Sequence, residues 1–465
     1  MPGPSAATDD RPPTGTRARR ESPFAALGFR PFRWWFLSQI TSASGGMTQA
    51  VATSWLVLTM TNSAVELGVL SSVTMLPSLL AGAWCGTLVD RMDRRRVLIG
   101  TQSMLTVLSL ALYLLIATHA VAYWSILLFS AGSGLVNALD GPARQVYVVD
   151  LVGRRRLTSA VSLYEVILNT SRVFGPAVGG VVLVVWGVGA CVLVNAVSFL
   201  APLAVLLLRR PAATATASAA TTTARQPRTA PADRRGGTLV GLRYAWSVPA
   251  IRSCLLIAAA SGILFNSGVL MPLLTDRVFH LGGGGYGALL SVFGVGALPG
   301  ALLAARSDEP TGRQVGLLAG ATGLCTAATA CAPDVALLYV GMAAVGFSSI
   351  WMIARANTLV QLQAAPELRG RVMGAWTMAL PGASPVTGLT MGVLADLAGA
   401  RAAFASAGLL MLAIVAGSWR GLTRTPPDHT LPDRALPDHT LPGPRTEPVT
   451  DSKQSQGAET VSPDP

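Results

Sequence analysis

The chain has 465 residues, of which 51% are hydrophobic and 12% are charged, and its mean hydropathy is +0.50. Because a soluble domain carries roughly 25% charged residues, this composition excludes a soluble globular protein and indicates an integral membrane protein. The formal net charge of +12 does not indicate a nucleic-acid partner, since the arginines stand at helix ends and in tails, as the positive-inside rule expects.

The cysteines fit small apolar core residues rather than ligands. All five lie in apolar runs without metal-ligand spacing, at Cys85, Cys191, Cys254, Cys325 and Cys331. We therefore expect no disulfide framework and no metal site. The sequence contains no Gly-x-x-x-x-Gly-Lys loop, so we expect neither ATP drive nor any cofactor. Residues 1–33 are polar and lack the apolar segment of a cleavable signal peptide.

Long apolar runs recur along the chain, each about the 20 residues that an α-helix needs to cross a hydrocarbon core. Residues 1–30 come before them, are rich in Pro, Ala and Arg, and predict a disordered cytosolic tail. The first six runs predict helices over residues 34–60, 66–89, 97–118, 121–142, 159–185 and 188–208. Residues 209–250 follow, where Ala, Thr, Pro and Arg dominate, and predict a flexible cytosolic linker.

A second block predicts helices over residues 253–275, 285–305, 313–331, 334–362, 371–396 and 401–419. The expected fold is therefore all-α and membrane-embedded, with about 12 transmembrane helices in two six-helix halves. The halves cover residues 31–208 and 251–420, and a disordered tail covers 421–465. Because arginines gather in the loops on one side, we expect both termini in the cytosol.

A short, densely charged hinge, Gly86 to Arg96, joins two of these helices. An arginine cluster of this kind fixes membrane topology, and a topology anchor is one interpretation. The order of residues is more specific than an anchor needs, and it resembles the signature loop between helices 2 and 3 of the major facilitator superfamily. The residues that match are Gly86, Leu88, Asp90, Arg91, Arg94 and Arg95, while Asp93 stands where many members have glycine.

The resemblance implies a transporter with a midplane site between its halves and a conformational-switch loop. In such a loop Asp90 accepts hydrogen bonds from a neighbouring helix N-terminus. The arginines pair with carboxylates or reach lipid phosphates.

The predicted fifth helix carries a charged face. Glu165, Asn169 and Arg172 share one side of that helix, and Arg172 lies roughly 20 Å into it. A charge at this depth costs several kcal/mol unless it is paired or faces a watery cavity. In this interpretation Glu165 is the sole deep carboxylate. Two hypotheses stay open: a Glu–Arg pair that fixes helix packing, or direct contact with substrate or proton.

The same helix continues into Gly175-Pro176-x-x-Gly179-Gly180. These glycines permit close packing and the proline kinks the helix. The motif resembles the helix-5 motif that marks exporters within the superfamily. The wider resemblance covers about residues 30–420 and is to the branch with the enterobactin exporter and the macrolide efflux permeases. The segments that carry it are Trp55–Thr59, Gly141–Gln145, Asn169 with Arg172, and Arg369–Gly374.

Two departures from this branch leave the coupling mechanism open. The predicted fourth helix lacks the intramembrane arginine of related drug–proton antiporters, and only Asp140 and Arg144 stand at its inner end. Gly46 to Gln49 stand where related permeases often carry an acidic residue. Four further polar residues inside apolar runs are candidates for the cavity: Gln49, Asn266, Arg355 and Asn357. Interhelical hydrogen bonding is the alternative for the two asparagines.

We expect a proton-coupled secondary exporter of hydrophobic or amphipathic small molecules, such as a drug, siderophore or secondary metabolite. It would act as a monomer in the cell membrane, with substrate, protons and the lipid bilayer as its partners and no nucleic acid. One alternative is an importer of a small nutrient. A membrane-embedded enzyme or sensor is the other, but no His/Cys/Asp cluster or nucleophile–base pair stands out in the sequence, so we expect no enzyme.

Overall fold

The computed structural model describes residues 25–89, 91–152, 157–208, 242–265, 267–306, 309–365 and 368–423. Within these ranges every regular element is a helix. The predictions for Asp90, for Asn266 and for most of both tails and of the linker lie outside the described residues. The end of the predicted disordered N-terminal tail is helical instead, at Ala25–Gly28 and from Arg30 on. The side chains of Glu165 and Asn169 also lie outside the description, although their backbone belongs to a helix.

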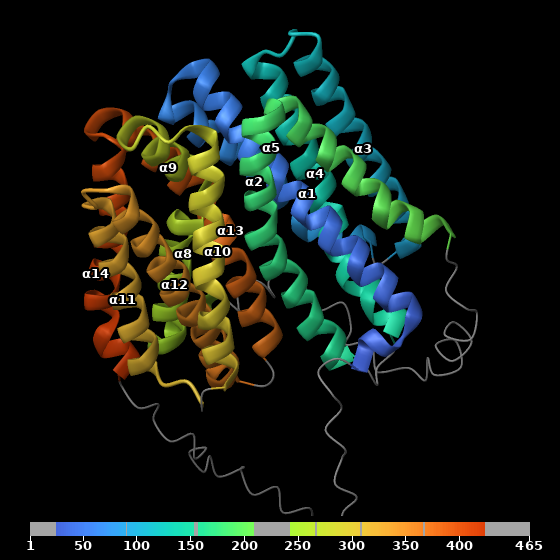
Figure 1. Cartoon of the computed structure of the whole chain (residues 1–465). Coiled ribbons are helices and arrows are strands. Elements are labelled where there is room, and N and C mark those ends of the chain that lie inside the picture. The colour runs from blue at the N-terminus through green and yellow to red at the C-terminus, as the bar shows by residue number, and fades with distance from the viewer. Residues whose placement is uncertain are drawn as a thin grey trace, which may run out of the picture. The chain divides into compact units, whose positions relative to one another are not determined.

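The first half begins with a short 3-10 helix, η1, and continues through five long helices (Figure 1). They are η1 (Ala25–Gly28), α1 (Arg30–Thr61), α2 (Ala64–Val89), α3 (Arg94–Ala117), α4 (Tyr123–Val152) and α5 (Leu157–Leu208). Within α5, Gly187 has φ 82° and ψ −177° and breaks the helix into two spans. Glycine permits this backbone conformation because it has no Cβ. The half therefore contains six spans, as the sequence predicts.

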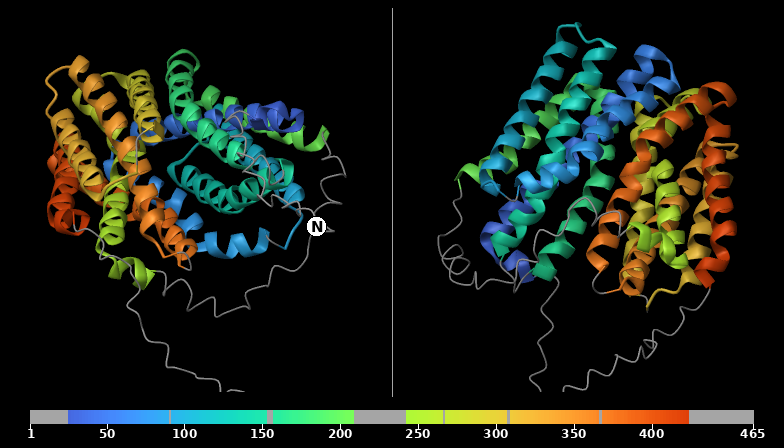
Figure 2. Two further views of the ribbon diagram at one scale, coloured as in Figure 1. Left: turned by 90° about the horizontal axis from the view of Figure 1, so that it is seen from below. Right: turned by 180° about the vertical axis from the view of Figure 1, so that it is seen from behind.

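The second half also supplies six spans. Three consecutive segments form its first span: α8 (Pro249–Phe265), α9 (Ser267–Leu273) and the π-helical η3 (Leu274–Val278). The other five are α10 (Gly282–Arg306), α11 (Gly312–Ala330), α12 (Val335–Gln363), α13 (Arg369–Ala398) and α14 (Ala400–Thr423). Figure 2 shows the blue-to-green helices of the first half grouped together, and the yellow-to-red helices of the second half grouped likewise.

The described helices suit a lipid environment. Six of them contain stretches long and apolar enough to cross a membrane: Ala64–Ala81, Arg94–Ala117, Val166–Leu208, Gly282–Arg306, Val335–Gln363 and Ala400–Thr423. Large apolar side chains stay exposed on their surfaces, among them Leu80 at 74%, Leu208 at 83% and Leu397 at 81%. Many large apolar side chains are exposed in this way, as expected where helices face a hydrocarbon core.

Helix α4 is longer than the sequence predicts. We expected its end at Pro142, but the helix continues through this proline to Val152. Proline is tolerated inside membrane helices because neighbouring helices and side chains satisfy the freed backbone groups. The extra turns keep Arg144 helical, which matters for the site described below.

The buried cores divide the molecule into two ends. We call the end with the turns after α1, α3 and α13 the corner end, and the opposite end, where α1 begins and α14 ends, the tail end (Figure 1). At the corner end one buried cluster includes side chains of both halves, such as Leu58 and Phe404. At the tail end, Trp35 belongs to a cluster of the first half and Met352 to a cluster of the second. The halves therefore share an apolar core at the corner end.

Two helix pairs bring the halves into backbone contact. In the first pair, a Cβ added to Gly180 of α5 would lie 3.0 Å from the Cα of Gly287 of α10, and one on Gly287 would overlap Gly180. In the second pair, a Cβ on Gly68 of α2 would lie 2.6 Å from the carbonyl oxygen of Gly388 in α13. Small residues permit this close approach of membrane helices.

Gly287→Ala is expected to lower the stability of the protein, because the added methyl group would overlap the Gly180 backbone, which has no rotamer to change. Overpacking of this kind costs about 1–3 kcal/mol of unfolding free energy. The measurement is the apparent melting temperature of the purified protein in detergent. Gly320→Ala is the matched control, since nothing lies within 4 Å of the Cβ position there. Equal melting temperatures for the two variants would contradict the proposed contact.

Candidate functional site

A cavity of about 560 Å³ lies among helices of the first half. Except for Gly268 of α9, its lining residues come from α1 to α5. Hydroxyl and amide side chains form much of the wall: Ser42, Gln49, Thr53, Ser71, Thr74, Ser109, Ser130, Ser133, Asn137 and Asn195. Apolar side chains share it: Met47, Leu67, Leu70, Met75, Leu105, Phe129 and Phe199. The mixed lining offers hydrogen bonds and apolar contact to one ligand.

Asp140 and Arg144 form an ion pair in the wall of this cavity. They stand at i and i+4 on α4, and the Nε of Arg144 contacts the Oδ2 of Asp140. The Asp140 residue is only 2% exposed. Its Oδ1 accepts hydrogen bonds from Thr101 Oγ1 at 2.6 Å and from Gln102 Nε2 at 2.8 Å. Arg144 also donates through Nη1 to the Oε1 of Gln39 on α1. The pair thus connects α1, α3 and α4.

Sequence reasoning placed Asp140 at a helix end and named Glu165 as the sole deep carboxylate. The word "sole" is wrong, because the Asp140 residue is 2% exposed and lines a cavity. The error follows from ending the helix at Pro142. If Arg144 were in a loop, its i, i+4 spacing from Asp140 would not imply contact, because this spacing brings side chains together only on a helix. The signal that could have revealed the pair is this spacing itself.

Gln49 lines the cavity and is 5% exposed. Its Oε1 accepts hydrogen bonds from Asn195 Nδ2 at 2.6 Å and from Ser109 Oγ at 3.1 Å. Asn195 follows the Gly187 break in α5, so three helices meet at this amide. Asn195 and Ser109 were not among the residues that the sequence singled out.

The exporter motif of α5 lies at packing positions. A Cβ on Gly175 would lie 2.8 Å from the carbonyl oxygen of Ser44 in α1, and Thr48 Oγ1 donates to the Gly175 carbonyl at 2.9 Å. Gly179 faces Thr48 in the same way. Gly180 instead faces α10 of the other half. Pro176, within this motif, is buried in α5.

The remaining predicted site residues lie elsewhere. Arg172 is partly buried on α5, and its carbonyl oxygen would lie 2.9 Å from a Cβ on Gly294 of α10. Arg355 is 4% exposed and donates from Nε and Nη2 to the Oε1 of Gln314 on α11, at 3.0 and 2.8 Å. Asn357 accepts from Gln361 on its own helix at 2.9 Å. None of the three predicted residues lines the cavity described above.

The charged hinge ties helix ends of the first half together. Asp93, which departs from the family pattern, caps α3 by accepting from the backbone N–H groups of Arg95 and Arg96. Arg94 pairs with Asp150 of α4 at 2.7 Å. Arg95 donates twice to the carbonyl oxygen of Leu206 in α5, at 2.9 and 2.6 Å. The backbone of Gly86 belongs to α2 and Arg91 is exposed.

Comparison with known proteins identifies relatives over most of the chain. A family model described as transmembrane secretion effector matches residues 21–441. The multidrug efflux pump Tap of Mycolicibacterium fortuitum is 31% identical over 386 residues, which cover 80% of this chain and 91% of that protein. The staphyloferrin A transporter of Staphylococcus aureus is 30% identical over 176 residues, or 38% of this chain and 44% of that protein. Macrolide efflux protein A of Streptococcus pyogenes is 24% identical over 152 residues, or 32% and 38%.

Solved structures share the fold at low sequence identity. The nucleoside transporter NupG aligns with a TM-score of 0.63 and 12% identity, over 85% of this chain and 100% of that chain. A bacterial homologue of the iron transporter ferroportin, in an inward-facing state, aligns with a TM-score of 0.61 and 16% identity, over 85% and 99%. The expected fold, all-α with two six-helix halves, is thereby confirmed.

Arg144→Leu is expected to destabilise the protein, because it leaves the buried Asp140 carboxylate without its counter-charge. Breaking a buried pair in this way costs about 3–5 kcal/mol. The double variant Asp140→Asn/Arg144→Leu should melt at a higher temperature than Arg144→Leu alone, since it removes the uncompensated charge. Apparent melting temperatures in detergent measure both effects.

Arg94→Leu provides the control for this comparison. The Arg94–Asp150 pair has side chains that are 37% and 46% exposed, and exposed pairs contribute only about 0–1 kcal/mol. A loss of stability in Arg94→Leu as large as in Arg144→Leu would contradict a special role for the buried pair.

Proposed function

This chain belongs to the transmembrane secretion effector family of the major facilitator superfamily, and from this membership we propose that it exports amphipathic small molecules across the cell membrane in exchange for protons. The names of two relatives support export, since they are a multidrug efflux pump and a macrolide efflux protein, and a third is named as a transporter of staphyloferrin A. They do not favour import of a nutrient. All are named for transport, so we propose no catalytic reaction.

The cavity supports an amphipathic cargo. Its volume of about 560 Å³ falls within the ~300–1,000 Å³ of typical small-molecule sites. The hydroxyl and amide groups of its wall match a cargo rich in oxygen and nitrogen, while Met47, Phe129 and Phe199 offer apolar contact. Asp140 and Arg144 are the charged side chains among its lining residues, and they balance each other.

The buried Asp140 carboxylate carries the proposal of proton coupling. It lines the cavity and forms an ion pair with Arg144. A proton that binds Asp140 removes the negative charge that attracts Arg144, and the wall then carries one net positive charge. A cargo group that donates to the carboxylate competes with the same proton. Proton and cargo therefore exclude each other at one group, which is what exchange transport requires.

We place the tail end in the cytosol. Arginines crowd the helix ends on this side, including Arg94 to Arg96 in α3, Arg306 in α10 and Arg369 in α13, in agreement with the positive-inside rule. Both termini are then cytosolic. In this orientation the apolar core shared at the corner end closes the outer side, and cargo enters from the cytosol.

The test of the function uses the purified protein in proteoliposomes, with ethidium and a radiolabelled macrolide as probes and an imposed pH gradient. We expect gradient-driven accumulation for wild type. Asp140→Asn should reduce it by roughly 5- to 150-fold, the usual range of coupling between two sites, while downhill equilibration of the probes persists. Asp334→Asn, which removes a carboxylate at the start of α12 outside the cavity, should behave as wild type.

Glu165→Gln is the comparison that can overturn the assignment. Loss of gradient-driven accumulation in Glu165→Gln, with retention in Asp140→Asn, would make Glu165 the coupling carboxylate. Probe movement in wild type that ignores the pH gradient would reject proton coupling altogether.

A further inference from the structure

The corner between α1 and α2 needs hydrogen-bond acceptors that its own sequence supplies only in part. The first N–H groups of any α-helix lack intrahelical partners. At the start of α2, Ser63 and Glu66 have the spacing of a capping box, and the Oγ of Ser63 accepts from the Glu66 N–H at 3.3 Å. The N–H groups of Ala64 and Val65 need another acceptor.

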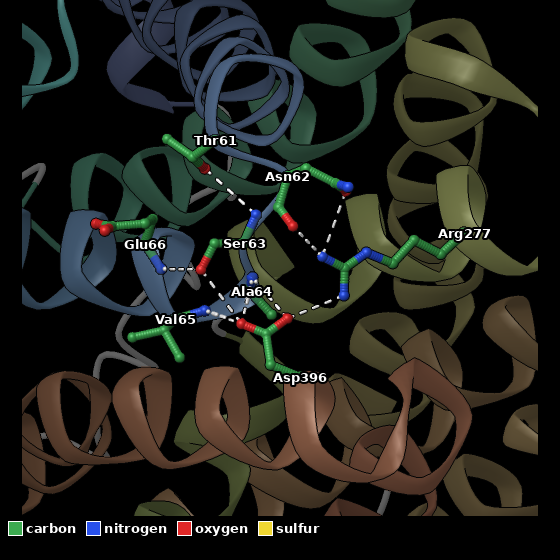
Figure 3. A network of polar contacts seen from close by, with 8 residues as sticks. All are labelled: Thr61, Asn62, Ser63, Ala64, Val65, Glu66, Arg277 and Asp396. Carbon is green, nitrogen blue, oxygen red and sulfur yellow. Dashed lines mark hydrogen bonds and ion pairs between the residues drawn. The ribbon is translucent and has the colours of Figure 1, made fainter.

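Asp396 supplies this acceptor from the other half of the molecule. It stands in the last turn of α13. Its two carboxylate oxygens accept from the Ala64 N–H at 3.1 and 3.0 Å, and Oδ2 accepts from the Val65 N–H at 3.0 Å. Ser63 Oγ also donates to Oδ2 at 3.2 Å. Figure 3 shows the carboxylate beneath the start of α2, facing these donors. Helix α2 is thus capped by a residue of the opposite half.

Arg277 lies at the end of η3 in the second half and contacts the other side of the corner (Figure 3). Its Nη1 lies 3.0 Å from Asp396 Oδ1, and its Nη2 donates to the carbonyl oxygen of Asn62. Asn62 ends α1 in a left-handed conformation, with φ 47°. A cation therefore meets the C-terminal end of α1 and an anion meets the N-terminal end of α2. Both charges complement the helix dipoles.

We infer that Asp396 and Arg277 are gate residues, which clasp the α1–α2 corner to hold the corner end shut and release it when the cavity opens there. The corner clasp comprises Asn62, Ser63, Ala64, Val65, Arg277 and Asp396. The inference rests on the proposed export function only for the direction of opening, outward.

Backbone contact brings the clasp into register. One turn before Asp396, a Cβ on Gly392 would lie 2.5 Å from the Ala64 carbonyl oxygen. Further along the same interface, Ser72 Oγ donates to the Pro385 carbonyl at 2.7 Å. The carboxylate reaches the α2 N-terminus because α2 and α13 already touch along these residues.

The clasp is suited to opening because water can replace it. The side chains of Arg277 and Asp396 are 28% and 29% exposed. When the halves separate at this end, the N–H groups of Ala64 and Val65 and the Asp396 carboxylate meet water. The clasp therefore biases the closed state without locking it, as a transporter that alternates between two states requires.

The test measures the distance between the halves at the corner end. Spin labels are placed at Ala120→Cys and Ala402→Cys, two exposed positions in the turn between α3 and α4 and at the start of α14. The full-length protein, with its native cysteines replaced, is studied in lipid nanodiscs without cargo or gradient. Asp396→Ala should raise the ratio of the long-distance to the short-distance population by roughly fivefold. This is the change in an equilibrium constant that corresponds to the free energy of one typical helix cap.

Two milder variants separate the cap from the charge. Asp396→Asn retains one carbonyl acceptor, and asparagine caps helices well, so its shift should be smaller than that of Asp396→Ala. Arg277→Gln removes the charge from the Asn62 side and should also shift the ratio towards long distances. Both keep the polar character of the site, so they serve as the test should Asp396→Ala fail to fold.

Asp334→Ala is the matched control. Asp334 caps α12 by accepting from the Leu337 N–H at 2.8 Å, within its own half. Its removal should lower the melting temperature and leave the distance distribution unchanged. An unchanged distribution in Asp396→Ala, or an equal shift in Asp334→Ala, would overturn the clasp. The distance measurement needs neither cargo nor a proton gradient. A negative export assay therefore does not affect the test of the clasp, and a negative distance measurement does not affect the test of export.

Discussion

Close contact between backbones is the constraint on which the arrangement of the two halves depends. Lipid tails are as apolar as leucine, so membrane helices gain little from burying apolar side chains against each other and associate through packing and hydrogen bonds. The backbones of α5 and α10 are in direct contact at Gly180 and Gly287, and those of α2 and α13 at Gly68 and Gly388. The Asp396 carboxylate reaches the α2 N–H groups only because the helices approach this closely.

Two carboxylates illustrate how the environment decides a role. Asp140 is buried, satisfied by Thr101, Gln102 and Arg144, and in contact with the cavity. Removing its charge leaves the partly buried Arg144 without a counter-charge, which is strongly destabilising. Asp396 is partly exposed at the surface of a helix end, where water can substitute for each of its partners. For the first environment we propose exchange of a proton for cargo, and for the second a contact that breaks when the corner end opens.

Much of the fold was predictable because apolar length is a local property. The predicted spans agree with the helices within a few residues at most ends, and Gly187 falls in the gap left between the fifth and sixth spans. The candidate site was less predictable. The sequence predicts a helix end at Pro142, whereas α4 continues through it, so the predicted helix does not reveal the contact of Asp140 with Arg144. Arg355, a cavity candidate, instead binds Gln314 of a neighbouring helix.

By itself the sequence determined the class of protein, the number of spans and the superfamily signature, because hydropathy, arginine placement and a short motif are all read locally. Only the tertiary structure decided which polar groups meet. Asp396 and Ala64 are 332 positions apart, and Gln49 and Asn195 are 146 apart. The residues around each of these positions do not indicate its hydrogen-bond partner, because a hydrogen bond between distant segments depends on which helices pack together and in which register.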